Sequence, residues 1–485
     1  MVEATGRSPY GQERGEPPRA AFFQRHLHTY RMYERRKGGS DTRQTRTAPR
    51  APSFVPPVLK GISMSTASTP HNDAPHDHAS GLLVTPSFRA IVVAQVFSLL
   101  GIEILQFVLP LYLLNLTGSG ALYGGVVAAG FIPYIGLSPV GGVIADRTRK
   151  RGVMAALDAL LAFMMLGYMA ASGTQHLVAL TIFVLMVAFA AQAIYHPCVQ
   201  SAVPLVVPQE RIPQATAIAN QVSMITGIGG PVIGGMIFGF FGLAPIMLVA
   251  AASFGVSCAL VLGFVRIPYE PPARTAGMVE TAVSDLRDAL GFLRGRPVLW
   301  QIIIAAMFVN LFGSSFINIG TPYIITESLG LSNQLMGVAQ GVLAVGGLLG
   351  GAVVMLRPER MTVRTSPWLI GLATVGIGVV AAVLLVVGEP LVAFAGMLVS
   401  YLWVMVCCMA ASILMTSFLQ MEAPAELTGK VMSLAMMFGN LATPLGQIAY
   451  GAAFDLAAPW VVAAVAAVAV GLVGVYLGRG YAREQ

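Results

Sequence analysis

The stretch Gly141-Gly142-Val143-Ile144-Ala145-Asp146-Arg147-Thr148-Arg149-Lys150-Arg151-Gly152 lies between two apolar runs, residues 122–140 and 153–173. Each run is close to the ~20 residues that a helix needs to cross a bilayer core. Four of the five residues at 147–151 are cations, which cannot lie in hydrocarbon, so this stretch is a loop in water. Short loops rich in Arg and Lys are typical of the cytoplasmic side. The stretch therefore predicts two membrane helices joined in the cytosol.

The composition of the whole chain fits a protein with many membrane helices. Of 485 residues, 56% are hydrophobic and 11% are charged, whereas about a quarter would be charged in a soluble protein. The net charge of +7 does not indicate a nucleic-acid partner. Thirteen of the 29 Lys and Arg lie in residues 1–89, and the other sixteen lie in short connections between apolar runs.

Sequence motifs give no indication of catalysis. The chain has no Walker A sequence, no His-Glu-x-x-His and no nucleophile elbow. Its four cysteines lie in or beside apolar segments and lack the spacing of a disulfide framework or a zinc site. We therefore expect no enzyme activity, no bound metal and no cofactor.

The apolar runs predict an all-α membrane protein with twelve transmembrane helices. We place the helices near residues 88–116, 121–141, 153–173, 177–203, 212–239, 243–265, 298–326, 334–356, 366–387, 391–418, 429–455 and 459–478. With this count every Lys and Arg after Arg89 falls in or at the edge of a connection on one side, and the connections on the other side hold none. The asymmetry predicts a cell-membrane protein with both termini in the cytoplasm.

Four landmarks recur at a nearly constant spacing. Leu100-Gly101 matches Phe312-Gly313 and Pro110 matches Pro322 at an offset of 212, and Pro231 matches Pro444 at 213. Gly142 before the basic loop matches Gly351 at 209. These offsets predict two six-helix halves that are parallel pseudo-repeats.

The predicted helices divide the chain into five parts. Residues 1–86 are polar and show no hydrophobic period, so we expect a disordered cytoplasmic tail, of which 1–63 could be a mis-assigned start before Met64. Residues 266–297 form a cytoplasmic linker in which an amphipathic helix either braces the halves or lies on the membrane surface. The two bundles span 87–265 and 298–478, and a short tail covers 479–485.

Glu103 is the clearest ionisable residue at membrane depth. It lies in the middle of the first helix, and no predicted membrane core offers a Lys or Arg to neutralise it. Such residues are functional candidates, because burying a charge in a bilayer is costly. We interpret Glu103 as a proton-coupling residue; the alternative is a protonated side chain bonded to a neighbouring helix. Asp158, close to the basic loop, is interpreted as an ion-pair partner of Arg147 or Arg151.

Polar residues at helical spacing could line a substrate cavity. The candidates are Gln106, Gln192, His196, Asn310, Ser314, Asn318 and Asn440. Each could equally bond to a neighbouring helix, which contributes roughly 0.6 kcal/mol per hydrogen bond in a membrane. We favour the cavity for the stripe Asn310, Ser314, Asn318 and Thr321 of helix seven, because one bonding partner does not require four aligned positions.

Helix five contains Gly230-Pro231-Val232-Ile233-Gly234-Gly235, whose small residues allow another helix to approach closely. This resembles the Gly-Pro-x-x-Gly-Gly element of exporters in the major facilitator superfamily. The basic loop resembles the motif between helices two and three of the same superfamily, through Gly142, Asp146, Arg147, Lys150 and Arg151. Arg149 stands where that motif has a glycine.

Further likeness to the macrolide-efflux-like branch of the drug–proton antiporters covers nearly all of the chain from residue 88, including 285–299 and 424–433. The resemblance implies an exporter of hydrophobic drug-like molecules or metabolites, driven by the proton gradient. We expect the transporter to be a monomer. It also implies that the loop motif forms a cytoplasmic gate, in which Asp146 meets the positive end of helix eleven. Two alternatives stay open: a proton-coupled importer of a small neutral nutrient, and a non-transporting membrane scaffold or sensor.

Overall fold

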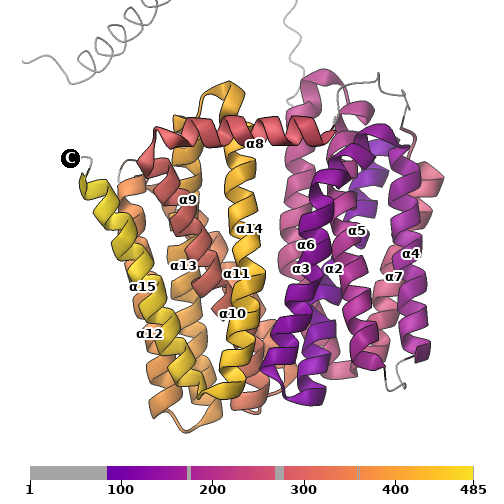
Figure 1. Cartoon of the computed structure of the whole chain (residues 1–485). Coiled ribbons are helices and arrows are strands. Elements are labelled where there is room, and N and C mark those ends of the chain that lie inside the picture. Colours follow the sequence, from indigo (N-terminus) through magenta and orange to yellow (C-terminus); the bar gives the residue numbers. More distant parts are fainter. Residues whose placement is uncertain (1–84, 172–175, 268–277, 358, 360, 484–485) are drawn as a thin grey trace, which may run out of the picture. The chain divides into compact units, whose positions relative to one another are not determined.

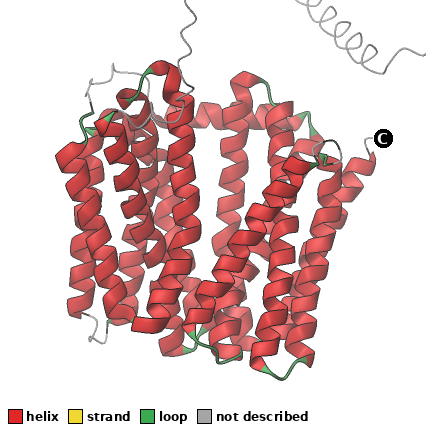
Figure 2. Cartoon of the chain, turned by 180° about the vertical axis from the view of Figure 1, so that it is seen from behind, coloured by secondary structure: helices red, strands yellow, loops and turns green. Residues whose placement is uncertain are grey.

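The described part of the chain consists of helices (Figure 2). The computed structural model describes residues 85–171, 176–267, 278–357, 359 and 361–483. The predictions about the N-terminal tail lie outside these residues. The first half contains α2 (Pro86–Thr117), α3 (Gly120–Arg147), α4 (Lys150–Ala171), α5 (Leu177–Val206), α6 (Ile212–Phe241) and α7 (Leu243–Phe264), with a short 3₁₀ turn at Gln209–Arg211.

The second half begins with one long helical segment that contains two π-helical turns. Its parts are α9 (Pro297–Val309), a π turn at Asn310–Ser314, α10 (Ser315–Tyr323) and a π turn at Ile324–Ser328. The other helices are α11 (Asn333–Leu356), α12 (Ser366–Val386), α13 (Pro390–Glu422), α14 (Ala425–Leu456) and α15 (Pro459–Arg483), with a 3₁₀ turn at Val363–Thr365. The linker helix α8 (Met278–Arg294) joins the two halves.

Local sequence explains where these helices begin and end. α2, α9 and α13 each begin with proline, which lacks an N–H that the first turn would leave unpaired. α2 ends at Gly118, whose φ of 66° is left-handed and favours glycine. The hydroxyl of Ser119 then accepts a hydrogen bond from Leu122 N–H at 3.2 Å and caps α3.

Twelve described helical segments run through the bundle, as expected from the sequence. Eleven of them are long and apolar enough to cross a membrane. The exception is α14, whose apolar character is reduced by Asn440, Thr443 and Gln447. The predicted all-α fold of two six-helix halves is confirmed.

The two halves repeat the same helix pairs, as the sequence offsets predicted. In the first half α2 packs on α6, α3 on α5 and α4 on α7. In the second half α10 packs on α14, α11 on α13 and α12 on α15 (Figure 1). Both halves belong to one compact unit, Pro75–Gln485, in which they meet through α3 with α14 and through α6 with α11.

Glycines allow these contacts between the halves. A Cβ added at Gly124 of α3 would collide with the backbone of Gln447 in α14, and one at Gly235 of α6 would meet Gly337 of α11 at 2.9 Å. Small residues at such crossings let two membrane helices approach at backbone distance.

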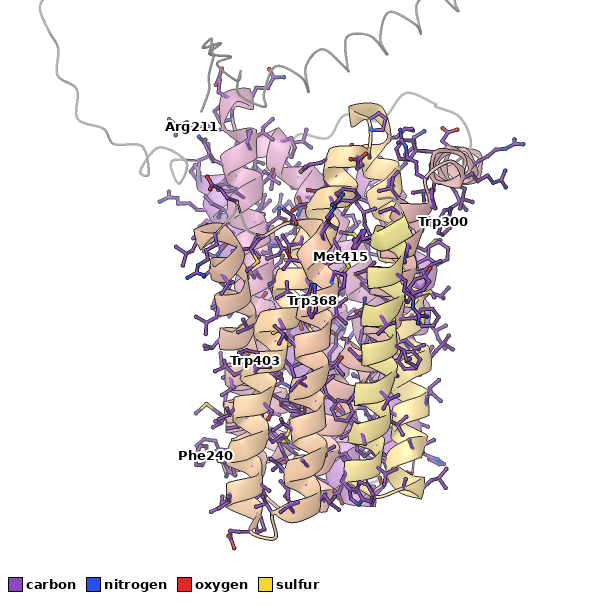
Figure 3. The ribbon with its side chains drawn as sticks, turned by 90° about the vertical axis from the view of Figure 1, so that its left-hand side faces the viewer. Arg211, Phe240, Trp300, Trp368, Trp403 and Met415 are labelled. Atoms are coloured by element: carbon purple, nitrogen blue, oxygen red, sulfur yellow. The ribbon has the colours of Figure 1, made fainter. Side chains whose placement is uncertain are left out.

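The bundle has two different ends, which we name by their charge. The basic end carries the loop 148–151, Arg211 and α8; the far end carries the connections that contain no Lys or Arg. Figure 3 shows Arg211, which directly precedes α6, at one end of the bundle and Phe240, near the end of α6, toward the other. Figure 1 shows α8 lying across the basic end. Helix α8 packs on α9 and α14, with Lys430 2.6 Å from Asp288, so it is fastened to the second half.

Candidate functional site

Glu103 lies on the side of α2 that faces α5 and α6. Its carboxyl accepts a hydrogen bond from Gln192 Nε2 of α5 at 3.1 Å, and Gln192 Oε1 accepts one from Gln106 Nε2 at 2.9 Å. No Lys or Arg in the described part of the chain bonds to Glu103. The predicted residues Glu103, Gln106 and Gln192 therefore form one hydrogen-bonded chain that ends on an acid without a cationic partner.

An aromatic cluster lies beside this acid. It consists of Phe131 and Tyr134 of α3 and Phe189 of α5, with ring centroids 5.0 to 6.4 Å apart. Tyr134 is close enough to Glu103 for an electrostatic interaction between the two side chains. The site thus combines a carboxyl group with flat apolar surface.

A second polar group joins α2, α5 and α6 nearer the basic end. His196 is exposed, and its Nε2 lies 3.4 Å from the Ser223 hydroxyl. Gln95 Nε2 donates to Ser223 Oγ and to Ala219 O, each at 3.1 Å. We did not predict Gln95 or Ser223 as site residues. Gln95 is eight residues before Glu103, a helical spacing that could have revealed it.

The residues of the polar stripe predicted on helix seven lie in different surroundings. Asn310 donates to Ala306 O at 3.1 Å and faces Gly439 of α14, whereas Asn318 is exposed and donates to Ser314 Oγ at 3.4 Å. Thr321 is fully buried. The π turn at Asn310–Ser314 takes up extra residues and so rotates the helix after it. Asn440 of α14 is also exposed.

The glycines of the Gly-Pro-x-x-Gly-Gly element face two different helices. A Cβ added at Gly230 would collide with Cβ of Glu103, and one at Gly234 would lie 3.1 Å from Val108, so both accommodate α2. Gly235 accommodates α11 of the other half. Pro231 lies inside α6 between these contacts. The element therefore packs α6 against the acid-bearing helix and against the second half at the same level.

The structure describes some of the side chains of the basic loop. Arg151 donates to Val261 O at 3.2 Å and to Leu262 O, which ties the start of α4 to the end of α7. The surroundings of Gly142 and the side chains of Asp146 and Arg147 lie outside the described part, and the gate predicted for them stays a prediction.

The ion pair expected between Asp158 and Arg151 is wrong. Both Asp158 oxygens accept hydrogen bonds from serine hydroxyls, while the guanidinium of Arg151 is bonded to backbone carbonyls. The helix spacing allowed a pair, but Asp158 faces α2 and α7, away from the loop.

At the far end an unpredicted residue joins the halves. Asp455, near the end of α14, accepts hydrogen bonds from Ser119 Oγ at 2.9 Å, Gly120 N–H at 2.6 Å and Ala121 N–H at 2.9 Å. A carboxylate at a helix N-terminus is stabilised by the helix dipole. Nearby, Asn115 bonds to Asn333 at 3.0 Å and Gln334 donates to Gly239 O at 2.5 Å. These bonds hold the halves together at the far end.

Known proteins resemble the chain along most of its length. A sequence profile of the Major Facilitator Superfamily matches residues 91–447. Macrolide efflux protein A of Streptococcus pyogenes is 23% identical over 373 residues, which covers 74% of this chain and 87% of that protein. Enterobactin exporter EntS of Salmonella typhimurium is 25% identical over 395 residues, covering 81% of this chain and 91% of the exporter.

Solved structures share the fold at low sequence identity. A bacterial homologue of the iron transporter ferroportin, in an inward-facing state, superposes with a TM-score of 0.63 at 16% identity, covering 81% of this chain and 99% of that one. A D-xylose–proton symporter gives a TM-score of 0.62 at 12% identity, covering 80% and 96%. The family match spans well over half of the residues and agrees with the repeated helix pairs. The chain belongs to the Major Facilitator Superfamily: it is a multi-pass membrane transporter and not an enzyme.

Proposed function

We propose that this chain is a secondary transporter that exports hydrophobic small molecules in exchange for protons. The observation that carries the proposal is Glu103, a carboxyl at membrane depth whose described partner is the neutral amide of Gln192. Burial away from water disfavours a charged carboxylate, so the group can take up a proton and release it when its surroundings change.

The export direction rests on relatives and on one sequence element. Two relatives that match most of the chain are named as an efflux protein and an exporter. The Gly-Pro-x-x-Gly-Gly element packs directly on Glu103 through Gly230, which ties the exporter-type element to the proposed proton site.

The proposed cargo is hydrophobic because the site offers aromatic rings and neutral amides. Phe131, Tyr134 and Phe189 provide ring faces, and Gln106 and Gln192 provide hydrogen bonds. A strongly anionic solute would need cationic side chains here. Aromatic faces beside a carboxylate also suit a cargo that carries an amine.

The proposed orientation places the basic end in the cytoplasm of the cell membrane, with both termini there. The halves are bonded at the far end through Asp455, so this conformation would be closed to the outside. At the basic end a Cβ added at Gly429 of α14 would meet no atom of the described residues within 4 Å, which suits a state that is open to the cytoplasm.

Alternating access would follow from exchanging contacts at the two ends. In the outward-open state Asp146 would meet the positive end of α14 near Thr428, an interaction worth up to about 2 kcal/mol. A difference of that size biases a two-state equilibrium more than tenfold. Protonation of Glu103 from outside would displace the cargo, and inward opening would release the proton. We propose that the transporter does this as a monomer.

Glu103→Gln tests the proposal, because the amide keeps the size of the side chain but cannot carry a proton. Proteoliposomes or cells would be loaded with a macrolide or a hydrophobic fluorescent dye, with the proton gradient present and then collapsed. We expect the export rate to fall to the rate that is measured when the proton gradient is collapsed. The affinity for the dye and the thermal unfolding midpoint should stay near those of the wild type. The matched control is Glu327→Gln, an exposed acid at the far end, which should transport normally. Wild-type export by Glu103→Gln would rule out the proton role.

A further inference from the structure

A second acid is buried in the first half, away from Glu103. Asp158 of α4 has no exposed surface and lies within a membrane-spanning helix. Its Oδ1 accepts a hydrogen bond from Ser98 Oγ of α2 at 2.6 Å, and its Oδ2 accepts one from Ser257 Oγ of α7 at 2.6 Å. The site described above does not use this acid.

A third hydroxyl lies beside the acid. Tyr195 of α5 is 1% exposed, and its hydroxyl lies close to those of Ser98 and Ser257. It is close enough to interact electrostatically with Asp158. We call the four residues Ser98, Asp158, Tyr195 and Ser257 the Asp158 cluster. It joins four helices through oxygen atoms alone.

The second half shows that the fold does not need this cluster. Helices α12 and α15 pair as α4 and α7 do, and Ile370, which stands 212 residues after Asp158 in the equivalent helix, is buried and apolar. A polar group that merely held these helices together would be expected in both halves. The acid therefore requires a reason beyond packing.

Charge balance indicates what the cluster binds. A buried carboxylate without a counter-charge costs several kcal/mol. Among the neighbouring side chains, Tyr195 and Cys258 cannot carry a positive charge. The guanidinium of Arg151 bonds to backbone carbonyls of α7. No Lys or Arg of the described part of the chain bonds to Asp158, so a bound proton would supply the balancing positive charge. Hard metal ions bind oxygen at 2.0–2.6 Å, which keeps neighbouring ligand oxygens about 3 Å apart. The 2.6 Å separations here fit a hydrogen atom instead.

We propose that the Asp158 cluster is a second proton-binding site of this transporter. An O–H bond forms on one Asp158 oxygen when a hydronium ion gives up its proton and becomes water, and the same bond breaks on release. Ser98 and Glu103 are five residues apart on α2, about 140° around the helix, so the cluster lies on a different face from Glu103. A proton here would not compete directly with cargo. The proposal rests on the proposed function only in the use of protons as coupling ions.

Infrared difference spectroscopy of the full chain in lipid nanodiscs tests it, because a protonated carboxyl has its own C=O stretching band. Spectra would be recorded across a pH titration for the wild type, Asp158→Asn and Glu103→Gln. We expect two buried carboxyl bands in the wild type, of which Asp158→Asn removes one and Glu103→Gln the other. Asp455→Asn, at an exposed acid, should remove neither buried band.

Ser257→Ala provides a second readout should Asp158→Asn fail to fold. It removes one hydrogen bond from the acid, so the band should shift in frequency and stay present. A buried-band pattern unchanged by Asp158→Asn, or by Ser257→Ala, overturns the proposal. So does a band that responds to Na⁺ at constant pH and not to pH. Loss of the Asp158 band with normal export by Glu103→Gln would keep this proposal and reject the proton role of Glu103.

Discussion

Glu103 and Ser315 occupy equivalent places in the two halves. In the first half α2 crosses α6 at Gly230, which lies against Glu103. In the second half the equivalent helices cross at Gly446, which lies against Ser315. Ser315 is fully buried, and its one hydroxyl hydrogen is shared between two backbone carbonyls, Asn310 O at 3.0 Å and Thr443 O at 3.2 Å. The same close helix crossing thus carries a hydroxyl that bonds to backbone carbonyls in one half and an acid in the other.

This difference separates the scaffold from the function. A serine at a tight crossing can donate its hydroxyl hydrogen to a backbone carbonyl, as hydroxyls in membrane helices commonly do. A carboxyl cannot, and Glu103 reaches across to α5 for Gln192. Because the second half makes the crossing without an acid, Glu103 is not needed to build the fold. The Asp158 cluster follows the same pattern, so both membrane-buried acids discussed here belong to the first half.

The largest effect should come from placing an acid in the second half. Ser315→Glu puts a carboxyl where the neighbouring helix leaves no space and where the described surroundings offer carbonyl oxygens. An unpaired buried charge of this kind costs at least about 3 kcal/mol. We expect little folded protein, measured as the monodisperse fraction in size-exclusion chromatography and as the thermal unfolding midpoint.

The matched variant Ser315→Ala keeps the close crossing and removes only the hydroxyl. It should cost about 1 kcal/mol and leave export intact. Normal folding of Ser315→Glu would mean that the second half tolerates an acid as the first half does. The contrast between Glu103 and Ser315 would then not separate scaffold from function.

A smaller effect should follow from adding one methyl group at the crossing in the first half. Gly230→Ala would bring Cβ against Cβ and the backbone of Glu103, so α2 and α6 must move apart. Overpacking of this kind costs about 1–3 kcal/mol. We expect lower thermal stability together with slower export, because Glu103 moves with α2.

Gly227→Ala is the control for this change. Gly227 lies one turn earlier on the same helix, and a Cβ there would meet no atom of the described residues within 4 Å. An alanine in open helix should be neutral or stabilising by up to about 1 kcal/mol. Equal losses in both variants would show that α6 is sensitive to any alanine, whatever lies beside it.

The sequence predicted those features that depend on composition along one helix. Apolar runs and one-sided charge were enough for twelve helices, because membrane helices must be continuous and apolar. The landmarks that recur at offsets of 209 to 213 were enough for two halves. The isolated acid Glu103 was also visible in this way. The partners of Asp158 were not, because Ser98 and Ser257 are 60 and 99 residues away and become neighbours only through helix packing. The π turn that rotates Asn310 relative to Thr321 has no signal in a 3.6-residue period.

The smallest effect should arise at the far end, where the two halves contribute different groups to one contact. The first half supplies the N-terminus of α3, and the second supplies the carboxylate of Asp455. Asp455→Asn keeps an oxygen acceptor but removes the charge, which should weaken the contact by about 0.3–1 kcal/mol.

The far-end-open state should then gain up to about fivefold in population. Spin labels at Leu116 and Leu456, both exposed, would report the distance between the two halves at the far end by pulsed electron paramagnetic resonance. Glu389→Gln, at an exposed acid whose carboxyl forms no hydrogen bond within the described residues, should leave the distance distribution unchanged. If both variants open the far end equally, general loss of negative charge controls the opening, and the contact of Asp455 with α3 does not.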